Sequence, residues 1–232
     1  MSLIKKIIPV FIKDFIKAHI KDEKAVFTSQ AGEDIILKNF FWQDYLSKEV
    51  AGFYIDIGAY HPQFFSNTDF FYKNEWSGIN IDGSKHSIAL FDKERTNDIN
   101  IHCVVSDTET EYYFPQGINS MNSISENTDG CEKVKSYTLK TLLNKYLPPN
   151  QEITFMSIDT EGYELSILES NDWDTFRPKV LLVEIEGKTI QETVESNIVT
   201  FLLSKRYKYV ARTYVVSHIG TAVFVDKSIR LP

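Results

Sequence analysis

Short apolar runs alternate with amphipathic stretches along most of the chain, and several runs end at a small or acidic residue. Runs rich in isoleucine, valine and phenylalanine are typical of strands buried on both faces, whereas apolar residues spaced three to four apart indicate helices. The expected strands are 53–57, 78–82, 99–105, 153–158, 179–185, 207–213 and 221–225. The expected helices are 35–42, 68–74, 86–96, 138–146, one ending near 170, and 191–205. This alternation predicts an α/β fold: a mostly parallel sheet, covered by helices on both faces and closed by an antiparallel C-terminal hairpin.

Residues 3–21 carry isoleucine and phenylalanine at helical spacing, with lysines mostly on the opposite side. We expect an amphipathic helix there, started or kinked by Pro9, as an N-terminal extension (1–27) of a single domain (28–232). Such a helix packs on its own domain or on a second subunit, or lies on an anionic membrane surface as a peripheral contact. Its lysines argue against a secretory signal, and no run of about 18 apolar residues predicts a membrane span.

Composition excludes some classes of function. The formal net charge of −7 argues against a nucleic-acid partner held through its phosphates. The two cysteines, Cys103 and Cys131, have neither metal-ligand spacing nor the pattern of a disulfide framework. We therefore expect a cytoplasmic protein, at the inner face of the membrane if the N-terminal helix binds lipid.

The first two strands end in residues typical of an adenosine-binding site. In a parallel sheet the ligand lies beyond the carboxyl ends of the strands. Gly58 follows the first strand, where a glycine lets the backbone approach a ligand, and Asp82 ends the second, where a carboxylate accepts hydrogen bonds from ribose hydroxyls. Asp82 could instead cap the helix that follows it. A nicotinamide dinucleotide would require G-x-G-x-x-G, which this turn lacks, so a methyl donor is favoured over a hydride carrier.

Other polar residues near strand ends are candidates for the same site. Asp56 is placed to hold the amino-acid end or the ribose side of the cofactor, or instead to order the following loop through backbone amides. Ser106 and Asp107 are placed to meet the adenine edge. The polar segment 107–130 contains Gly117-Ile-Asn-Ser-Met-Asn-Ser123, a loop that we expect over the site.

Methyl transfer to an alcohol requires a base or a metal ion, because a protonated hydroxyl is a poor nucleophile. The candidate bases lie at strand ends and in the hairpin turn: His61, Asp159, Glu161, Glu184, Glu186 and His218. Acids after adjacent strands could also bind a divalent cation such as Mg²⁺. Glu161 and Glu164 could instead stabilise the first turn of the next helix. The aromatic residues expected to frame the cofactor or acceptor are Tyr60, Phe64, Phe65, Trp76 and Tyr163.

A set of motifs occurs here in an order and spacing that are specific to one family. The motifs are Ser29-Gln30 with Gly32-Glu33-Asp34, Asp56-Ile-Gly-Ala-Tyr-His-Pro62, Ser66-Asn67-Thr68, Gly78-Ile-Asn-Ile-Asp82, Val105-Ser106-Asp107 and Ile158-Asp-Thr-Glu-Gly-Tyr-Glu164. Over residues 28–226 the chain thereby resembles the FkbM-type S-adenosylmethionine-dependent methyltransferases. The resemblance implies the Rossmann-like class I methyltransferase fold, with a seven-stranded sheet whose last strand is antiparallel. It also implies methyl transfer to a hydroxyl, commonly of a sugar or a polyketide-type product. One departure is that the cofactor loop keeps only Gly58 among its usual glycines.

The residues and the resemblance together predict an O-methyltransferase that uses S-adenosylmethionine and acts on a hydroxyl, of a sugar in a surface glycan or of a secondary metabolite. The expected cofactor-binding residues are Gln30, Asp34, Asp56, Gly58, Ala59, Tyr60, Ser66, Asn67, Asp82, Gly83, Ser106, Asp107 and Asp159. The expected catalytic residues are His61, Asp159, Glu161 and Glu184. The alternatives are a nicotinamide-dependent oxidoreductase and a non-catalytic, membrane-apposed module. The expected partner is a small-molecule or glycan acceptor; the sequence leaves open whether the protein forms an oligomer.

Overall fold

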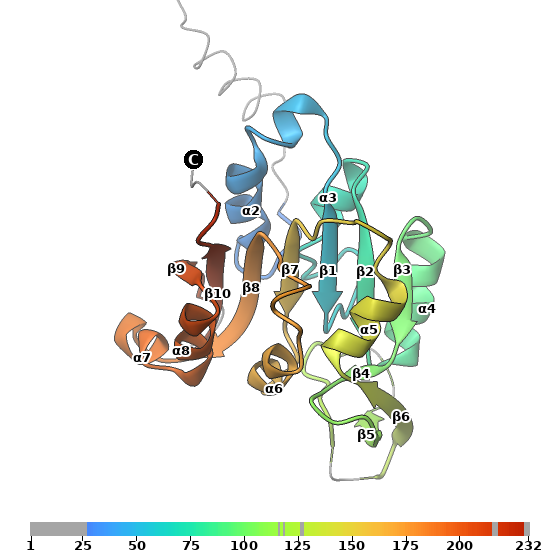
Figure 1. Cartoon of the computed structure of the whole chain (residues 1–232). Coiled ribbons are helices and arrows are strands. Elements are labelled where there is room, and N and C mark those ends of the chain that lie inside the picture. The colour runs from blue at the N-terminus through green and yellow to red at the C-terminus, as the bar shows by residue number, and fades with distance from the viewer. Residues whose placement is uncertain (1–26, 116, 118, 126–127, 215–217, 230–232) are drawn as a thin grey trace, which may run out of the picture.

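One sheet of seven strands forms the centre of the molecule (Figure 1). The computed structural model describes residues 27–115, 117, 119–125, 128–214 and 218–229. The strand order is β3-β2-β1-β7-β8-β10-β9. The bounds are β1 Phe53–Ile57, β2 Ser77–Asp82, β3 Ile99–His102, β7 Phe155–Ile158, β8 Val180–Glu186, β9 Tyr207–Arg212 and β10 Ile219–Asp226. Every neighbouring pair is parallel except the two made by β10, which confirms the predicted parallel sheet with its antiparallel hairpin.

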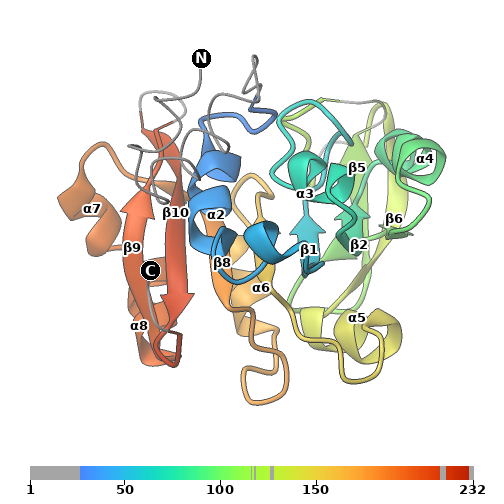
Figure 2. The ribbon, with the colours of Figure 1, turned by 90° about the horizontal axis from the view of Figure 1, so that it is seen from above.

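Helices cover both faces of this sheet, as Figure 2 shows from above. Their bounds are α2 Glu33–Phe41, the 3₁₀ turn η2 Leu46–Lys48, α3 Asp69–Lys73, α4 Lys85–Glu94, α5 Leu139–Tyr146, α6 Glu164–Glu169, α7 Ile190–Val194 and α8 Asn197–Ser204. Leu139 of α5, Ile167 of α6 and Leu202 of α8 belong to the hydrophobic core on one face. Leu37 of α2 and Phe71 of α3 belong to the core on the other. The sheet is therefore buried on both sides, which explains the continuous apolar runs of its strands.

The strand order reverses beside β1, and this reversal positions the site. The chain first adds β2 and β3 on one side of β1, then returns to add β7 on the other. Backbone hydrogen bonds join the turns that leave these strands: Gly58 N donates to Ile81 O at 2.9 Å, and Asp159 N donates to Ile57 O at 3.0 Å. Such a switch point is where open α/β sheets bind ligands.

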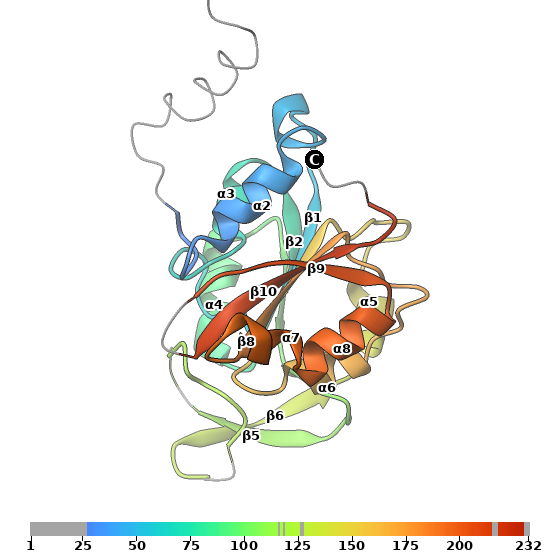
Figure 3. The same cartoon turned by 90° about the vertical axis from the view of Figure 1, so that its left-hand side faces the viewer.

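A second, three-stranded sheet lies beyond the carboxyl ends of β1 to β3 (Figures 1 and 3). It consists of β4 Val104–Val105, β5 Glu111–Pro115 and β6 Cys131–Tyr137. The sequence prediction of one strand over 99–105 is wrong. Strand β3 ends at His102, and after Cys103 the chain continues as β4 in the small sheet. No strand was expected in the polar segment 107–130, where β5 lies, and β6 was not expected either. A small core of Val104, Phe114 and Val134 holds this sheet together.

Two helix boundaries also differ from expectation. The helix predicted over 191–205 is two helices, because Ser196 caps α8 by accepting a hydrogen bond from Val199 N at 3.2 Å. Helix α2 begins at Glu33 after Gly32, which takes the left-handed conformation. The helix and peripheral membrane contact predicted for 3–21 lie outside the described residues. Among the helices that the structure does describe, none is both long and apolar enough to cross a bilayer.

Candidate active site

Gly58 ends β1 in a conformation that only glycine adopts easily, with φ of 76°. A β-carbon built on it would stand 1.7 Å from the backbone oxygen of Asp159. The glycine therefore lets the turn after β1 lie directly against the turn after β7. Tyr60, the next residue with positive φ, at 54°, lines the cavity beside this contact.

Asp82 ends β2 and organises the backbone around it. Its two carboxylate oxygens accept hydrogen bonds from Tyr60 N at 2.8 Å and Ser84 N at 2.6 Å. Burial raises the pKa of this carboxyl, and the two amides oppose that shift. The N-cap of α4 is Ser84, so the alternative role of Asp82 as a helix cap is wrong. Because a carboxylate offers about four lone-pair positions, Asp82 can still accept from ligand hydroxyls.

A cavity lies beside Gly58 and Asp82. One part is polar, with Asp82, Asn119 and Asn122, and another is apolar, with residues of the second sheet and the loop before α6. The apolar part is lined by Cys103, Val104, Val105, Phe114, Ile124 and Tyr163. The Phe114 ring lies so near Gly83 that a β-carbon there would stand 2.5 Å from it. This cofactor cavity, as we call it, has the mixed polarity that suits a nucleoside.

The loop 119–125 covers the cofactor cavity, as the sequence suggested. Ser123 Oγ donates to Thr160 O at 3.3 Å and to Glu161 O at 3.2 Å, which joins the loop to the turn after β7. Ser84 Oγ donates to Gly117 O at 2.9 Å on the other side. Serine hydroxyl groups thus join the loop over the cavity to the turn after β7 and to the start of α4.

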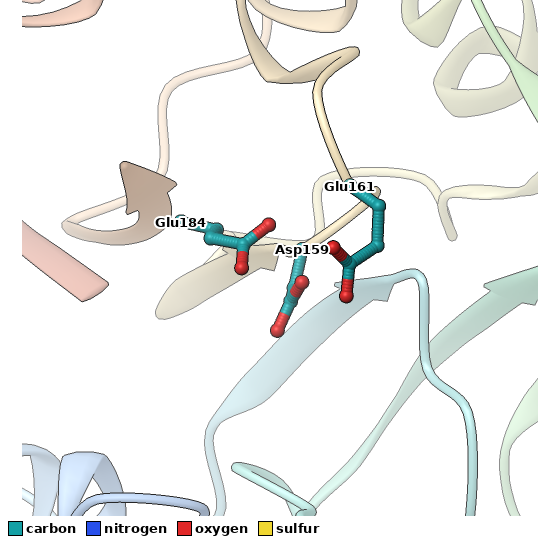
Figure 4. A group of neighbouring side chains, drawn as sticks. All are labelled: Asp159, Glu161 and Glu184. Carbon is teal, nitrogen blue, oxygen red and sulfur yellow. The ribbon is translucent and has the colours of Figure 1, made fainter. Parts of the chain in front are cut away.

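A second cavity shares a wall with the first. Gly58, Tyr60, Ser120 and Asp159 line both. The remaining walls of this acidic cavity, our name for it, come from Gln30, Phe65, Met121, Glu161, Glu184 and Ile219. In Figure 4 the side chains of Asp159, Glu161 and Glu184 gather at the ends of β7 and β8, with one oxygen of each within 4.8 Å of the others.

The acidic cavity holds its carboxyl groups at unusual pKa values. Burial and the neighbouring Glu184 raise the pKa of Asp159 well above its ordinary value. Burial and the charges of Glu161 and Glu164 raise the pKa of Glu184 to about 7. The Asp159 and Glu184 carboxyls hydrogen-bond to each other, so the two groups titrate as a pair. Perturbed carboxyls in a cavity are typical of functional sites.

Glu164 has a structural role, in contrast to its neighbour Glu161. Glu164 is buried, and its Oε1 accepts hydrogen bonds from Thr160 N at 2.8 Å and Gly162 N at 3.1 Å. It thereby orders the turn that presents Asp159, and it stands in the first turn of α6 as expected of an acid there. Glu161, at φ 56°, contributes its carboxylate to the acidic cavity instead.

The structure brings together part of the expected site. Gly58, Tyr60, Asp82, Gly83 and Asp159 line the cofactor cavity. Gln30, Glu161 and Glu184 line the acidic cavity, where Gln30 was expected on the cofactor side. The other expected residues lie outside both cavities as the described residues form them: Asp34, Asp56, Ala59, His61, Ser66, Asn67, Ser106 and Asp107.

Several of these residues have hydrogen-bond partners close by in the fold, which explain why a polar side chain stands at that position. Asp56 accepts from Thr68 Oγ1 at 3.1 Å, and burial raises its pKa to about 6. Asp34 accepts from Ser29 Oγ at 2.6 Å at the start of α2. Ser106 Oγ donates to Asp107 Oδ1 at 3.2 Å, and Asp107 is exposed. The structure thus gives these polar groups partners within the fold, and their contact with the cofactor stays a prediction.

His61 orders its own turn and lines neither cavity. Its Nδ1 accepts hydrogen bonds from Gln63 N at 3.1 Å and Phe64 N at 3.2 Å. Burial lowers the pKa of the imidazole. With this nitrogen engaged and the ring outside both cavities, the structure does not support His61 as the base. His218 and Glu186 likewise do not line the acidic cavity.

Sequence reasoning missed Arg95, which fixes the loop after β1. Its buried guanidinium donates to Pro62 O and to Ser66 Oγ, and it lies 3.6 Å from Asp69 Oδ1 and 3.9 Å from Asp98 Oδ2. An arginine at the end of an amphipathic helix is typical of a solvated surface, so the sequence carried no signal of this role. Arg95 therefore joins the cofactor loop to α3 and to the polar end of α4.

The comparison with known families agrees with this geometry. The model of the methyltransferase FkbM domain matches residues 56–209, more than half of the chain. The chain belongs to the FkbM methyltransferase family. This confirms the expected family and, with it, the class I methyltransferase fold. No curated protein matches the sequence significantly.

Solved structures resemble this FkbM protein in fold. The FkbM methyltransferase from Methylobacillus flagellatus KT is similar with a TM-score of 0.50 and 12% identity, over 75% of this chain and 43% of that one. This chain thus spans less than half the length of that relative. A precorrin-6y C5,15-methyltransferase from Geobacter metallireducens GS-15 gives a TM-score of 0.46 at 12% identity, over 89% of this chain and 95% of that one. A toxoflavin-precursor N1-methyltransferase from Burkholderia thailandensis, with bound S-adenosylhomocysteine, gives 0.44 at 11% identity, over 93% and 87%.

The cofactor cavity of this FkbM protein fits S-adenosylmethionine. Asp82 keeps acceptor capacity for the ribose hydroxyls, and the Phe114 side of the cavity is apolar enough for adenine. Gly58 and Asp159 lie where the cofactor cavity meets the acidic cavity. The site can therefore hold a nucleoside in one cavity and an acceptor in the other.

Proposed function

We propose that this protein transfers a methyl group from S-adenosylmethionine to a hydroxyl of a polyhydroxylated acceptor, a sugar of a surface glycan or a secondary metabolite. The observation that carries the proposal is the shared wall of the two cavities, where Asp159 meets both. A group bound in the acidic cavity lies next to the cofactor cavity and against the carboxyls. Such proximity is the main requirement of a methyl transfer.

In this proposal the cofactor cavity binds the methyl donor, and the acidic cavity binds and activates the acceptor. Asp82 orients the ribose, and the Phe114 side encloses the base. Bound there, S-adenosylmethionine supplies a methyl group whose bond to sulfur breaks with its electron pair left on the sulfur. In the acidic cavity the Asp159–Glu184 pair accepts the proton of the acceptor hydroxyl as the oxygen gains the methyl group. A pair with a pKa near 7 is matched to that task at neutral pH.

Oxygen is favoured over nitrogen or carbon as the acceptor atom because of the carboxyl cluster. An alcohol must lose its proton to become a strong nucleophile, whereas a neutral amine need not. The cluster also offers several hydrogen-bond acceptors to an acceptor with more than one hydroxyl. The nicotinamide-dependent alternative has no observation in its favour.

The carboxyl cluster leaves two ways to activate the hydroxyl. Three oxygens within 4.8 Å also suit a divalent cation such as Mg²⁺, which prefers oxygen ligands. We favour the proton-accepting pair, because Asp159 and Glu184 already bond to each other. Dialysis against EDTA tests this: activity is expected to persist, and loss of activity that added MgCl₂ restores would assign the cluster to a cation instead.

Cofactor binding tests the proposal first. Isothermal titration with S-adenosylhomocysteine is expected to show binding to the wild type and roughly 10- to 100-fold weaker binding to Asp82→Asn, since a hydrogen bond to a charged group is lost. Asp107→Asn is the matched control, because Asp107 is exposed and outside the cavity. No heat of binding with the wild type would refute the proposal, and NADH titrated in parallel would identify the oxidoreductase alternative.

Acceptor chemistry tests the second part. Transfer of a radiolabelled methyl group to hydroxylated acceptors, with a product stable to alkali as an ether is, would support O-methylation. Label found only on amines would contradict it.

We further propose a cytoplasmic location, with peripheral contact of residues 3–21 to an anionic membrane; the lysine-faced pattern of that segment supports it. Flotation of the full chain with vesicles containing phosphatidylglycerol tests the contact, and failure to float would refute it. The oligomeric state stays open, and light scattering would measure it.

A further inference from the structure

Two aromatic side chains form part of the acidic cavity. Tyr60 and Phe65 both line it, and their rings lie nearly parallel, with centroids 6.2 Å apart and planes 22° apart. Phe65 is 52% exposed although it carries a large apolar ring. Met121 and Ile219 add further apolar surface to the same cavity. One part of the cavity is therefore apolar, while the carboxyls and Gln30 make the other part polar.

The backbone that presents these two rings is strained. Tyr60 and Phe65 both adopt φ of 54°, in the left-handed region that side chains disfavour. The exposed ring of Phe65 contributes little hydrophobic stabilisation, and its positive φ costs conformational energy. Neither the ring nor the backbone conformation therefore stabilises the fold. Strain of this kind gathers at functional sites.

Hydrogen bonds hold both ends of the strained segment 60–66. Arg95 donates to Pro62 O and Ser66 Oγ. Ser66 N donates to Thr28 O at 2.9 Å, and Asp82 holds Tyr60 N. The position of Phe65 is thus set by bonds at both ends of the loop, and not by burial of its own ring.

We propose that Phe65 is the stacking platform for the carbon face of a hexopyranose ring of the acceptor, with the hydroxyl edge of that ring toward Asp159 and Glu184. The inference rests on the proposed function and adds the residue that selects the acceptor. A pyranose has an apolar C–H face and a polar rim of hydroxyls, and the acidic cavity offers an aromatic surface beside carboxyl groups. The two surfaces match in chemistry.

Other occupants fit the cavity less well. An ammonium group would also suit aromatic rings beside carboxylates. However, Gln30, Met121 and Ile219 also line the cavity, and this mixture of amide and apolar surface suits the hydroxyls and C–H face of a pyranose better than a compact cation. A second copy of the chain would be expected to meet the most exposed ring, Phe64 at 65%, which lies outside the cavity with its ring 4.7 Å from that of His61.

Saturation-transfer NMR with the full chain and bound S-adenosylhomocysteine tests the platform. The probes are methyl β-D-galactopyranoside and methyl α-L-rhamnopyranoside, with putrescine as the cationic probe. Ring C–H protons of at least one pyranoside should receive saturation with the wild type. Phe65→Ala should weaken that binding about 5- to 10-fold, as loss of one aromatic contact does. Phe65→Tyr should retain it, and Phe64→Ala, the matched control next in sequence, should leave it unchanged.

The outcomes separate this inference from the function on which it rests. Failure of the wild type to bind S-adenosylhomocysteine would remove the proposed function itself. Cofactor binding with no pyranoside signal, a signal from putrescine alone, or equal signals in Phe65→Ala and wild type would overturn the platform. A change of oligomeric mass in Phe65→Ala, with pyranoside binding unchanged, would overturn it in favour of a contact between copies.

Discussion

Gly58 and Asp159 touch across the centre of the site: the missing β-carbon of the one would stand 1.7 Å from the backbone oxygen of the other. The turns after β1 and β7 can be this close only because residue 58 has no side chain. Both residues line both cavities, so the contact lies where cofactor and acceptor meet. The geometry of the methyl transfer therefore depends on a backbone contact more than on any single side chain.

Replacing Gly58 by alanine should separate the two turns and weaken cofactor binding. We expect Gly58→Ala to lower the free energy of unfolding by about 2–4 kcal/mol, from the positive φ together with the overlap, and to abolish measurable S-adenosylhomocysteine binding. Gly130→Ala is the matched control, because Gly130 has a similar φ of 71° but no atom within 4 Å of the added carbon. Urea denaturation and calorimetry measure both effects. Equal effects of the two substitutions would show that strain alone, and not the contact, matters.

Glu184→Gln should remove the base while leaving the cofactor cavity intact. We expect kcat to fall about 100-fold, the scale of general-base catalysis, with unchanged affinity for S-adenosylhomocysteine. The wild-type rate should rise with pH through about 7, where the Glu184 carboxyl loses its proton. In the variant the remaining pKa, that of Asp159, should move down because the charge of Glu184 no longer raises it.

The control for this experiment is Glu186→Gln, two residues further along β8 at an exposed position. It should retain both the rate and the pH profile. A wild-type rate that does not depend on pH between 5 and 9 would argue against a carboxyl base altogether.

Stability should fall as pH rises through the neutral range. Burial raises the pKa of Asp56 from 3.8 to about 6, and that of Glu184 from 4.5 to about 7. The folded protein therefore holds protons that the unfolded chain has released, and the stabilisation is present below about pH 4 and lost as pH rises to about 7. We expect the free energy of unfolding to fall by about 2–4 kcal/mol between pH 5 and 8, allowing for partial exposure of Glu184.

Urea denaturation at the two pH values measures this change. Asp56→Asn should flatten the dependence, whereas Asp107→Asn, at an exposed site, should leave it as in the wild type. Stability that instead increases from pH 5 to 8 would contradict the assignment.

Arg95 should stabilise the fold strongly although it lines neither cavity. Its side chain is 2% exposed between Asp69 and Asp98. Arg95→Met leaves both acids without this partner, and we expect a loss of about 3–5 kcal/mol in the free energy of unfolding. Lys73→Met is the matched control: Lys73 also pairs with Asp69, but its side chain is 61% exposed, and its loss should cost under about 1 kcal/mol. Similar losses for both variants would refute the role of Arg95.

The sequence predicted the main sheet well because its strands are buried on both faces and read as continuous apolar runs. It missed β5 and β6 because these strands carry charged residues such as Glu111, Lys133 and Lys135 and bury only isolated positions, Phe114 and Val134 among them. A strand with one poorly buried face at the surface gives no apolar run. The break at Cys103 was equally hidden, since Ile99 to Val105 is apolar at alternate or successive positions throughout.

The strand-end acids were predicted as a group but could not be told apart. In the register of the sheet Asp56 lies opposite Asn80 and Ser157, one step inside the strand ends, where Thr68 covers it. Asp82 lies two residues beyond Asn80 and so reaches the cavity. A difference of two residues along a strand decides between a buried structural acid and a ligand-binding one, and only the packing of other segments reveals it.

The loop 119–125 over the cofactor cavity has one more consequence, for how the cofactor binds and leaves. Hydrogen bonds of Ser123 join this loop to the turn after β7, and Ser84 holds the neighbouring Gly117, whereas the second sheet is anchored to the main core through Val105. Opening the loop requires the loss of a few hydroxyl hydrogen bonds, each of about 1 kcal/mol, while the central sheet stays folded. Cofactor exchange is thereby a local event whose rate can be adjusted by mutation of two serines without loss of the fold.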